Sequence, residues 1–297
     1  MGKALADAFV PARAVFQEVD DALSQKLSRI MWEGPESDLM LTENAQAAIM
    51  AASLALVAVL KEGGLDVGKH VRLVAGHSLG EYSALCAAGA FTLANTARLL
   101  KIRGRAMQSA VPVGEGAMTA LIGAEIEVAE AVAREAAAPG GVCVVANDNA
   151  PGQVVVSGSK DALDRVPEIA RAHGVKRAIP LSVSAPFHCP LMQPAADAMA
   201  EALSKVTIRP PVVPVLANVT AQESAEPDMI RRLLVEQVTG RVRWRESILA
   251  LRPLRVDTTV EMGGNKVLTG MVKRIDKELQ TVTLDTPAEI EAFAKVL

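Results

Sequence analysis

The stretch Gly76-His77-Ser78-Leu79-Gly80 decides how this sequence folds. It matches Gly-x-Ser-x-Gly, a pattern in which a sharp turn between a strand and a helix holds a serine hydroxyl clear of a sheet. Residues 71–75 are apolar except for Arg72 and predict a short buried strand, and residues 81–88 predict a helix that ends at Gly89. We expect Gly76 and Gly80 to leave room for the turn and for close helix–strand packing. The alternative is a glycine-rich packing turn without chemistry, because the motif alone is a weak signal.

Composition sets the class of the protein. The 297 residues are enough for a large α/β domain that carries a smaller one, and half of them are hydrophobic. Only 3% are aromatic, so we expect an aliphatic core. The net charge of −3 argues against a general nucleic-acid binder, which would present a strongly basic face. Cys86, Cys143 and Cys189 show neither a metal-ligand spacing nor a disulfide framework, so we expect no metal site and a reducing, cytoplasmic compartment.

The most apolar segment, residues 45–60, lies between Glu43 and Lys61 and is followed by Gly63-Gly64. No apolar run of about 18 residues is free of charge, and no signal peptide is recognisable. The sequence therefore predicts a buried core helix here and no contact with a membrane.

The order of elements predicts two domains. Residues 1–62 are mainly helical in pattern, with Thr42 as the expected N-cap of the apolar helix, and a further helix is expected over residues 92–110. Residues 114–184 follow the order βαββαβ, the split βαβ signature of a ferredoxin-like module. The strands are expected at 117–122, 142–146, 153–157 and 175–181, and the helices at 125–138 and 161–173.

Alternating α/β character returns from residue 185. Strands are expected at 213–219 and 256–262, helices at 228–238, 244–251 and 266–275, and a tight turn at Gly263-Gly264. We therefore predict an α/β fold in which an α/β-hydrolase-like catalytic domain, residues 1–113 and 185–297, is interrupted by a small ferredoxin-like domain, residues 114–184.

Six stretches are spread over nearly the whole chain: residues 76–82, Arg103-Gly104 with Met107-Gln108, Gly116-Ala117-Met118, residues 147–153, residues 184–188 and residues 263–270. In this order they resemble the malonyl-CoA:acyl-carrier-protein transacylases of fatty-acid synthesis and the related acyltransferase domains of polyketide synthases. The resemblance implies ping-pong acyl transfer without a bound cofactor. Ser78 would take malonyl from coenzyme A, and the phosphopantetheine thiol of an acyl carrier protein would then attack the acyl-serine.

The resemblance also implies the partners of the serine. A serine hydroxyl is a weak nucleophile and needs an adjacent base, and His188 matches the family base. Elimination favours the same residue, because His70 and His173 lie beside turn glycines and His77 lies inside the motif itself. The backbone carbonyl of Gln237 would orient the imidazole. The alternative for Gln237 is an ordinary helix C-terminal residue, and the chain continues with Gly240-Arg241 where the family often has Asn-Pro.

Substrate contacts are implied in the same way. Arg103 resembles the family arginine that pairs with the free carboxylate of malonyl, for which a guanidinium fork is suited. Its alternative is a solvated helix face shared with Lys101 and Arg105. Phe187 resembles the residue of malonyl-preferring members, with core packing as its alternative. The remaining expected pocket residues are His77, Met118, Asn147 and Asn149, and the two asparagines read equally well as turn residues.

One part of the family pattern is missing from this sequence. Family members begin with a strand and a Gly-Gln-Gly-Ser-Gln loop, which supplies half of the oxyanion hole; the backbone N–H of Leu79 would supply the other half. The loop occurs nowhere in the 297 residues, and the first six residues match the helix that follows it. We expect Met1 to be an internal methionine of a longer natural chain. A real truncation would cost roughly 10²–10³ in rate through the lost oxyanion donor.

Because carrier proteins are usually acidic, we expect basic clusters to contribute to docking: Arg241, Arg243 and Arg245, then Lys273-Arg274, then Lys176-Arg177. Three functions remain open at this point. They are malonyl transfer to a carrier protein, a related acyltransferase for another extender unit or an acyl hydrolase, and a catalytically impaired carrier-binding homologue. A hydrolase of neutral acyl groups needs no buried cation, so the environment of Arg103 separates the first from the second.

Overall fold

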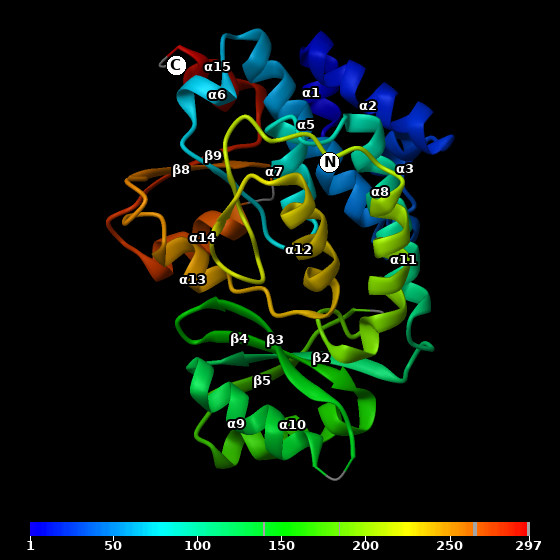
Figure 1. Ribbon diagram of the computed structural model, residues 1–297, viewed down its shortest axis with the longest axis vertical. Coiled ribbons are helices and arrows are strands. Elements are labelled where there is room, and N and C mark those ends of the chain that lie inside the picture. Colours follow the sequence, from blue (N-terminus) through cyan, green and yellow to red (C-terminus); the bar gives the residue numbers. More distant parts are fainter. Residues whose placement is uncertain (139, 184, 264–265, 296–297) are drawn as a thin grey trace.

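The computed structural model describes residues 1–138, 140–183, 185–263 and 266–295, and it has a mixed α/β architecture (Figure 1). Helices and two short sheets form the upper part of Figure 1. A four-stranded sheet with two helices forms the lower part, and it is built from one continuous segment in the middle of the chain.

The first 62 residues are helical, as the sequence predicts. The helices are α1 (Lys3–Ala8), α2 (Val10–Leu23), α3 (Leu27–Glu33), α4 (Glu36–Met40) and α5 (Thr42–Glu62). By length and composition α5 could cross a membrane, but 72% of its most apolar window is buried inside the protein, which confirms the expected core helix. The expected N-cap is wrong by one position. Leu41 precedes the helix, while the Thr42 hydroxyl turns toward Gln108 Oε1 at 3.5 Å.

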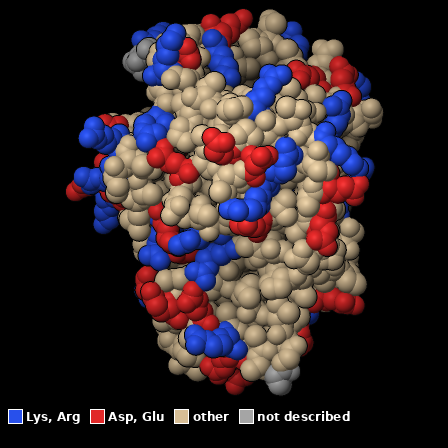
Figure 2. Space-filling view, viewed as in Figure 1, with Lys and Arg blue, Asp and Glu red and all other residues tan. Residues whose placement is uncertain are grey.

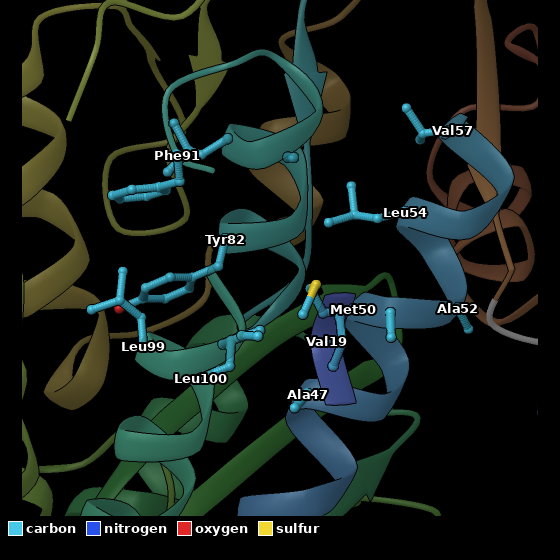
Figure 3. Close-up of a cluster of buried hydrophobic side chains, with 14 of the residues drawn as sticks. Val19, Ala47, Met50, Ala52, Leu54, Val57, Tyr82, Phe91, Leu99 and Leu100 are labelled. Carbon is cyan, nitrogen blue, oxygen red and sulfur yellow. The ribbon is translucent and has the colours of Figure 1, made fainter. Parts of the chain in front are cut away.

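Helix α5 packs against α7 (Gly80–Ala87) and α8 (Leu93–Ser109), and the short α6 (Val67–His70) precedes them. Figure 3 shows Met50 and Leu54 of α5, Tyr82 of α7 and Leu99 of α8 within the largest hydrophobic cluster. The Tyr82 ring stacks on Phe91 with centroids 6.4 Å apart. Helix α7, which follows Ser78, and helix α8, which carries Arg103, therefore pack on a largely aliphatic layer.

Two short sheets complete the upper part. Strand β1 (Val74–Ala75) runs parallel to β6 (Val215–Leu216), which pairs antiparallel with β7 (Glu223–Ser224). The first two are shorter than predicted, because only two residues of each find a ladder partner. Strand β8 (Thr258–Met262) pairs in parallel with β9 (Gln280–Leu284), which the sequence analysis did not anticipate. The expected turn at Gly263-Gly264 lies partly outside the described residues.

The other elements of the upper part are helical. They are the 3₁₀ turn η1 (Pro190–Met192), α11 (Gln193–Ser204), α12 (Pro227–Thr239), α13 (Trp244–Leu249), α14 (Val267–Ile275) and α15 (Pro287–Ala294). Each expected helix of this region is present within a few residues of its predicted bounds.

The lower part has the predicted order βαββαβ: β2 (Gly116–Ile122), α9 (Ile126–Ala137), β3 (Cys143–Ala150), β4 (Gln153–Ser159), α10 (Lys160–Ala172) and β5 (Arg177–Pro180). The sheet is antiparallel, with strand order β3-β4-β2-β5. Helices α9 and α10 cover one face, and residues such as Leu121, Val132 and Val156 form a core separate from that of the upper part. The opposite face packs Met118 and Ala146 against Phe187 of the upper part.

Strand β3 also joins the two parts through its backbone. Val242 N–H donates to Ala146 O at 2.8 Å, and Asp148 N–H donates to Val242 O at 3.0 Å. The buried Asp148 carboxylate pairs with Arg245 at 3.0 Å. Strand β3 therefore extends beyond the predicted 142–146, and Asn147 and Asn149 lie in a strand rather than in a turn.

Candidate active site

Ser78 lies in a strained turn between β1 and α7. Its φ is +53°, in the left-handed region that favours glycine. A Cβ on Gly76 would lie 2.0 Å from the backbone of Gly80, so only glycine fits at position 76. The expectation for Gly80 is wrong: a Cβ there would meet nothing within 4 Å, and the close approach needs its backbone alone. The turn therefore has the geometry that the motif predicts, with one obligatory glycine.

Ser78, His188 and Gln237 form a hydrogen-bonded chain. Ser78 Oγ lies 2.8 Å from His188 Nε2, and His188 Nδ1 lies 2.8 Å from the backbone oxygen of Gln237. Because a carbonyl oxygen can only accept, Nδ1 carries the proton and Nε2 is left to accept from the serine hydroxyl. Burial, together with the nearby Arg103 cation, lowers the pKa of His188 to about 3. The imidazole is therefore neutral at neutral pH, the form that a general base requires.

Arg103 is buried beside this chain, on α8, with 1% of its surface exposed. One terminal nitrogen, Nη1, donates to Gln46 Oε1 at 2.7 Å. The other, Nη2, donates to Ser78 Oγ at 3.1 Å and to Gln237 Oε1 at 3.0 Å. Among the described residues, no carboxylate hydrogen-bonds to this guanidinium. The site thus holds a buried cation whose direct partners are all neutral.

The neighbouring cations on α8 behave differently. Lys101 Nζ lies 3.0 Å from a carboxylate oxygen of Glu43, and Arg105 Nε lies 2.5 Å from the same oxygen. The alternative of one solvated helix face for all three cations is therefore wrong, since Arg103 points to the other side of α8.

A cavity of about 520 Å³ opens onto Ser78 and Arg103. Apolar and small polar side chains surround the two, namely Ser37, Met40, Leu41, Thr42, Ala45, Gln46, Leu79, Met107, Ser182, Val183 and Phe187. Ser184, which belongs to the motif of Phe187 and His188, lies outside the described residues. The cavity thus opens onto a nucleophile and a cation, and the base is hydrogen-bonded to the nucleophile.

Four expected substrate contacts do not line this cavity, within the ranges that the structure covers. Met118 packs in the small apolar cluster that Phe187 touches. His77 Nε2 lies 2.8 Å from Asn149 Oδ1, and Asn147 forms a backbone bridge to Val242. These contacts hold the lower sheet against the upper part, and the His77–Asn149 bond joins it to the turn at Ser78. A role of the four residues in substrate binding stays a prediction.

Comparison with known proteins places this geometry in a family. The family model of the acyl transferase domain matches residues 1–286. The chain belongs to the acyl transferase family. The malonyl CoA-acyl carrier protein transacylase of Bacillus subtilis is 41% identical over 297 residues, which is 100% of this chain and 92% of the relative. The protein of the same name from Escherichia coli K12 is 43% identical over 277 residues, 93% of this chain and 88% of the relative.

Solved structures agree with this membership. The acyl-carrier-protein S-malonyltransferase of Bartonella henselae superposes with a TM-score of 0.97 at 54% identity, covering 100% of this chain and 94% of that one. A malonyl transacylase in complex with a type II polyketide synthase acyl carrier protein superposes with a TM-score of 0.96 at 39% identity, covering 100% of this chain and 95% of that one.

Sequence reasoning missed several residues that this acyl transferase places around Ser78. They are Gln46, Glu81, Asn218 and the side chain of Gln237. Glu81 alone left a signal, as a single acid in the first turn of an otherwise apolar helix. The others become visible only when segments up to about half the chain apart meet, as Ser78 and Gln237 do.

Of the seven basic residues expected to dock a carrier, the three of the first cluster form ion pairs. Arg241 pairs with Glu130 at 2.6 Å, Arg243 pairs with Glu246, and Arg245 pairs with Asp148. On the face drawn in Figure 2, basic and acidic side chains lie beside one another in several groups, with uncharged surface between them. The contribution of the three clusters to docking stays a prediction, and for Arg241, Arg243 and Arg245 it would require exchange of existing ion pairs.

Proposed function

We propose that this protein transfers malonyl from coenzyme A to the phosphopantetheine thiol of an acyl carrier protein through an acyl-serine at Ser78. The observation that carries the proposal is the buried Arg103 cation, which touches Ser78 Oγ and has no hydrogen-bonded carboxylate among the described residues. A buried cation that no carboxylate hydrogen-bonds directly is costly. A malonyl thioester brings a carboxylate close to its reacting carbonyl, so it can satisfy the cation and meet the nucleophile together.

The steps follow from the hydrogen bonds. Ser78 Oγ attacks the thioester carbonyl and gives its proton to His188 Nε2, while Gln237 O holds Nδ1–H. The tetrahedral oxyanion accepts from the backbone N–H of Leu79. Its collapse breaks the C–S bond, and coenzyme A leaves with the proton of His188. In the second half the pantetheine thiol gives its proton to His188, attacks the acyl-serine and releases Ser78, which takes the proton back.

The substrates and the partner are those named for the relatives, malonyl-CoA and acyl carrier protein. No cofactor takes part in these steps, since proton transfer and acyl transfer need only the side chains above. We place the enzyme in the cytoplasm, with no nucleic acid or membrane as a partner.

We also propose a finer description of the fold. Residues 1–113 and 185–297 form an α/β-hydrolase-like catalytic domain, and residues 114–184 form a ferredoxin-like insertion. The strand order β3-β4-β2-β5 and two helices on one face support the second assignment. The turn from β1 through Ser78 into α7 supports the first.

Intact-protein mass spectrometry after mixing with malonyl-CoA tests the function. We expect a malonyl adduct on the wild type and none on Ser78→Ala, and we expect the adduct to disappear when holo carrier protein is added. An adduct that persists on Ser78→Ala, or that water removes as fast as the carrier does, would contradict the proposal.

A further inference from the structure

Glu81 is a buried acid beside the nucleophile that none of the steps above uses. It lies in the first turn of α7, three residues after Ser78, with 2% of its surface exposed. Its Oε2 accepts from the side-chain amide of Gln237 at 2.7 Å and from the backbone N–H of Asn218 at 3.1 Å. Burial raises the pKa of this carboxyl, and the positive charge of Arg103 opposes that rise. A carboxylate is rarely buried without a function or a set of partners, and here both partners contact residues of the active site.

The first partner, Asn218, holds both sides of the strained turn. Its Oδ1 accepts from the backbone N–H of Ser78 at 2.7 Å, and its Nδ2 donates to the carbonyl of Gly76 at 2.7 Å. A non-glycine residue at positive φ persists only when its surroundings over-determine it. Asn218 supplies that constraint, and Glu81 holds Asn218 through its backbone.

The second partner, Gln237, contacts all three functional residues. Its Nε2 donates to the backbone carbonyl of Ser78 at 3.0 Å as well as to Glu81, and its Oε1 accepts from Arg103. Its own backbone oxygen is the acceptor for His188 Nδ1. A displacement of Gln237 would therefore disturb the serine and the base together, while Arg103 would lose one hydrogen bond and keep the one to Gln46.

We propose that Glu81 is a positioning residue that holds Asn218 and Gln237 and thereby fixes Ser78 against His188. The inference rests on the proposed function, since its readout is acyl transfer. A carboxylate accepts from both donors as a strong, charge-assisted partner. Removal of its charge weakens both hydrogen bonds and loosens the turn at its two contact points, whereas Arg103 stays held by Gln46 Oε1, which Glu81 does not contact.

The test compares Glu81→Gln with Asp20→Asn in the full chain. Asp20 is also a buried acid, on α2, and its carboxylate accepts from Ser28 N and Oγ at 2.8 and 2.7 Å, away from the cavity. Rapid-quench mass spectrometry measures the rate of acyl-serine formation over a range of malonyl-CoA concentrations. We expect Glu81→Gln to lower the maximal acylation rate roughly ten- to hundredfold, as misplacement of reacting groups does. We expect the malonyl-CoA concentration for half-maximal rate to stay within about twofold, and Asp20→Asn to keep both values.

Asn218→Ala provides a second variant should Glu81→Gln fail to fold. It leaves Glu81 intact and removes both contacts to the turn, so the same loss of maximal rate at unchanged half-saturation is expected. Wild-type acylation rates in Glu81→Gln and Asn218→Ala would overturn the inference while leaving the proposed function intact. The inference would also be overturned if the maximal acylation rate fell only in proportion to the folded fraction, by the same factor as in Asp20→Asn. Absence of an acyl-serine on the wild type would refute the proposed function and this inference with it.

Discussion

Replacement of Arg103 by methionine isolates the charge on which the proposed function depends. Methionine fills a similar volume with a flexible apolar chain, so the aliphatic surroundings on α8 stay packed. Three neutral groups lose a donor, namely Gln46 Oε1, Gln237 Oε1 and Ser78 Oγ. The malonyl carboxylate loses more, since it would enter a buried site without a cation.

The magnitude follows from that difference. Removal of one partner of a buried ion pair costs about 3–5 kcal/mol, which corresponds to roughly 10²–10⁴ in kcat/KM for malonyl-CoA. A neutral acetyl thioester makes no such pair, so its kcat/KM should stay unchanged or rise. The assay measures transfer of each acyl group to holo carrier protein and reports the ratio of the two specificity constants.

The matched control for Arg103→Met is Lys101→Met. Lys101 is a buried cation two residues away on the same helix, but its partners are Glu43, Gln25 and Asn44 rather than the residues of the site. We expect this variant to lower thermal stability without changing the acyl preference. A malonyl-to-acetyl ratio in Arg103→Met that equals the wild-type ratio would refute the assignment of Arg103 as the carboxylate-binding group.

Two further predictions concern stability. Burial raises the pKa of Glu81 from 4.5 to about 7, so this acid lowers the free energy of unfolding as pH rises from 4.5 through 7. Burial and Arg103 lower the pKa of His188 from 6.5 to about 3, so this histidine lowers the free energy of unfolding as pH falls from 6.5 through 3. The two effects oppose each other between pH 4.5 and 6.5, and the Tm of Glu81→Gln should rise more steeply with pH over this window than that of the wild type; equal slopes in a thermal-unfolding series would contradict the two shifts. Gly76→Ala should prevent folding or acylation because its Cβ would meet the Gly80 backbone at 2.0 Å, whereas Gly80→Ala should fold with an unchanged or slightly higher Tm, by up to about 1 kcal/mol in the free energy of unfolding. Soluble expression and thermal unfolding of both variants check this contrast. Equal yields and equal Tm values for the two variants would contradict it.

Local signals explain which parts of the fold were predictable. The turn at Ser78 follows from glycine spacing, and the helices around it follow from apolar periodicity, because both are properties of contiguous residues. The order βαββαβ in residues 116–180 was predictable for the same reason. Strand β9 was not, since it has only five residues and forms because β8 lies beside it. Strands β1 and β6 were overestimated, because apolar character alone does not tell how many residues find a partner.

The pairing of polar side chains depends on contacts between distant segments. Asn149 was expected in a pocket or a turn, yet it bonds to His77, 72 positions away. Arg241 was expected on a free basic rim, yet it pairs with Glu130 across the two parts of the molecule. In both examples the residue type indicates that a polar partner is needed, while only the fold decides which partner lies within reach.

Gln237 shows why the two kinds of information must be combined. The resemblance assigns it a backbone role, and a backbone carbonyl could come from any residue type, so that role alone does not explain a glutamine. The amide explains it, because its nitrogen donates to Ser78 O and Glu81 while its oxygen accepts from Arg103. A carboxylate at this position would lose both donors and face Glu81 with a like charge. An apolar side chain would leave Glu81 and Arg103 with fewer partners at the centre of the site. The glutamine is therefore the residue type that can hold an acid, a cation and the turn at Ser78 at the same time.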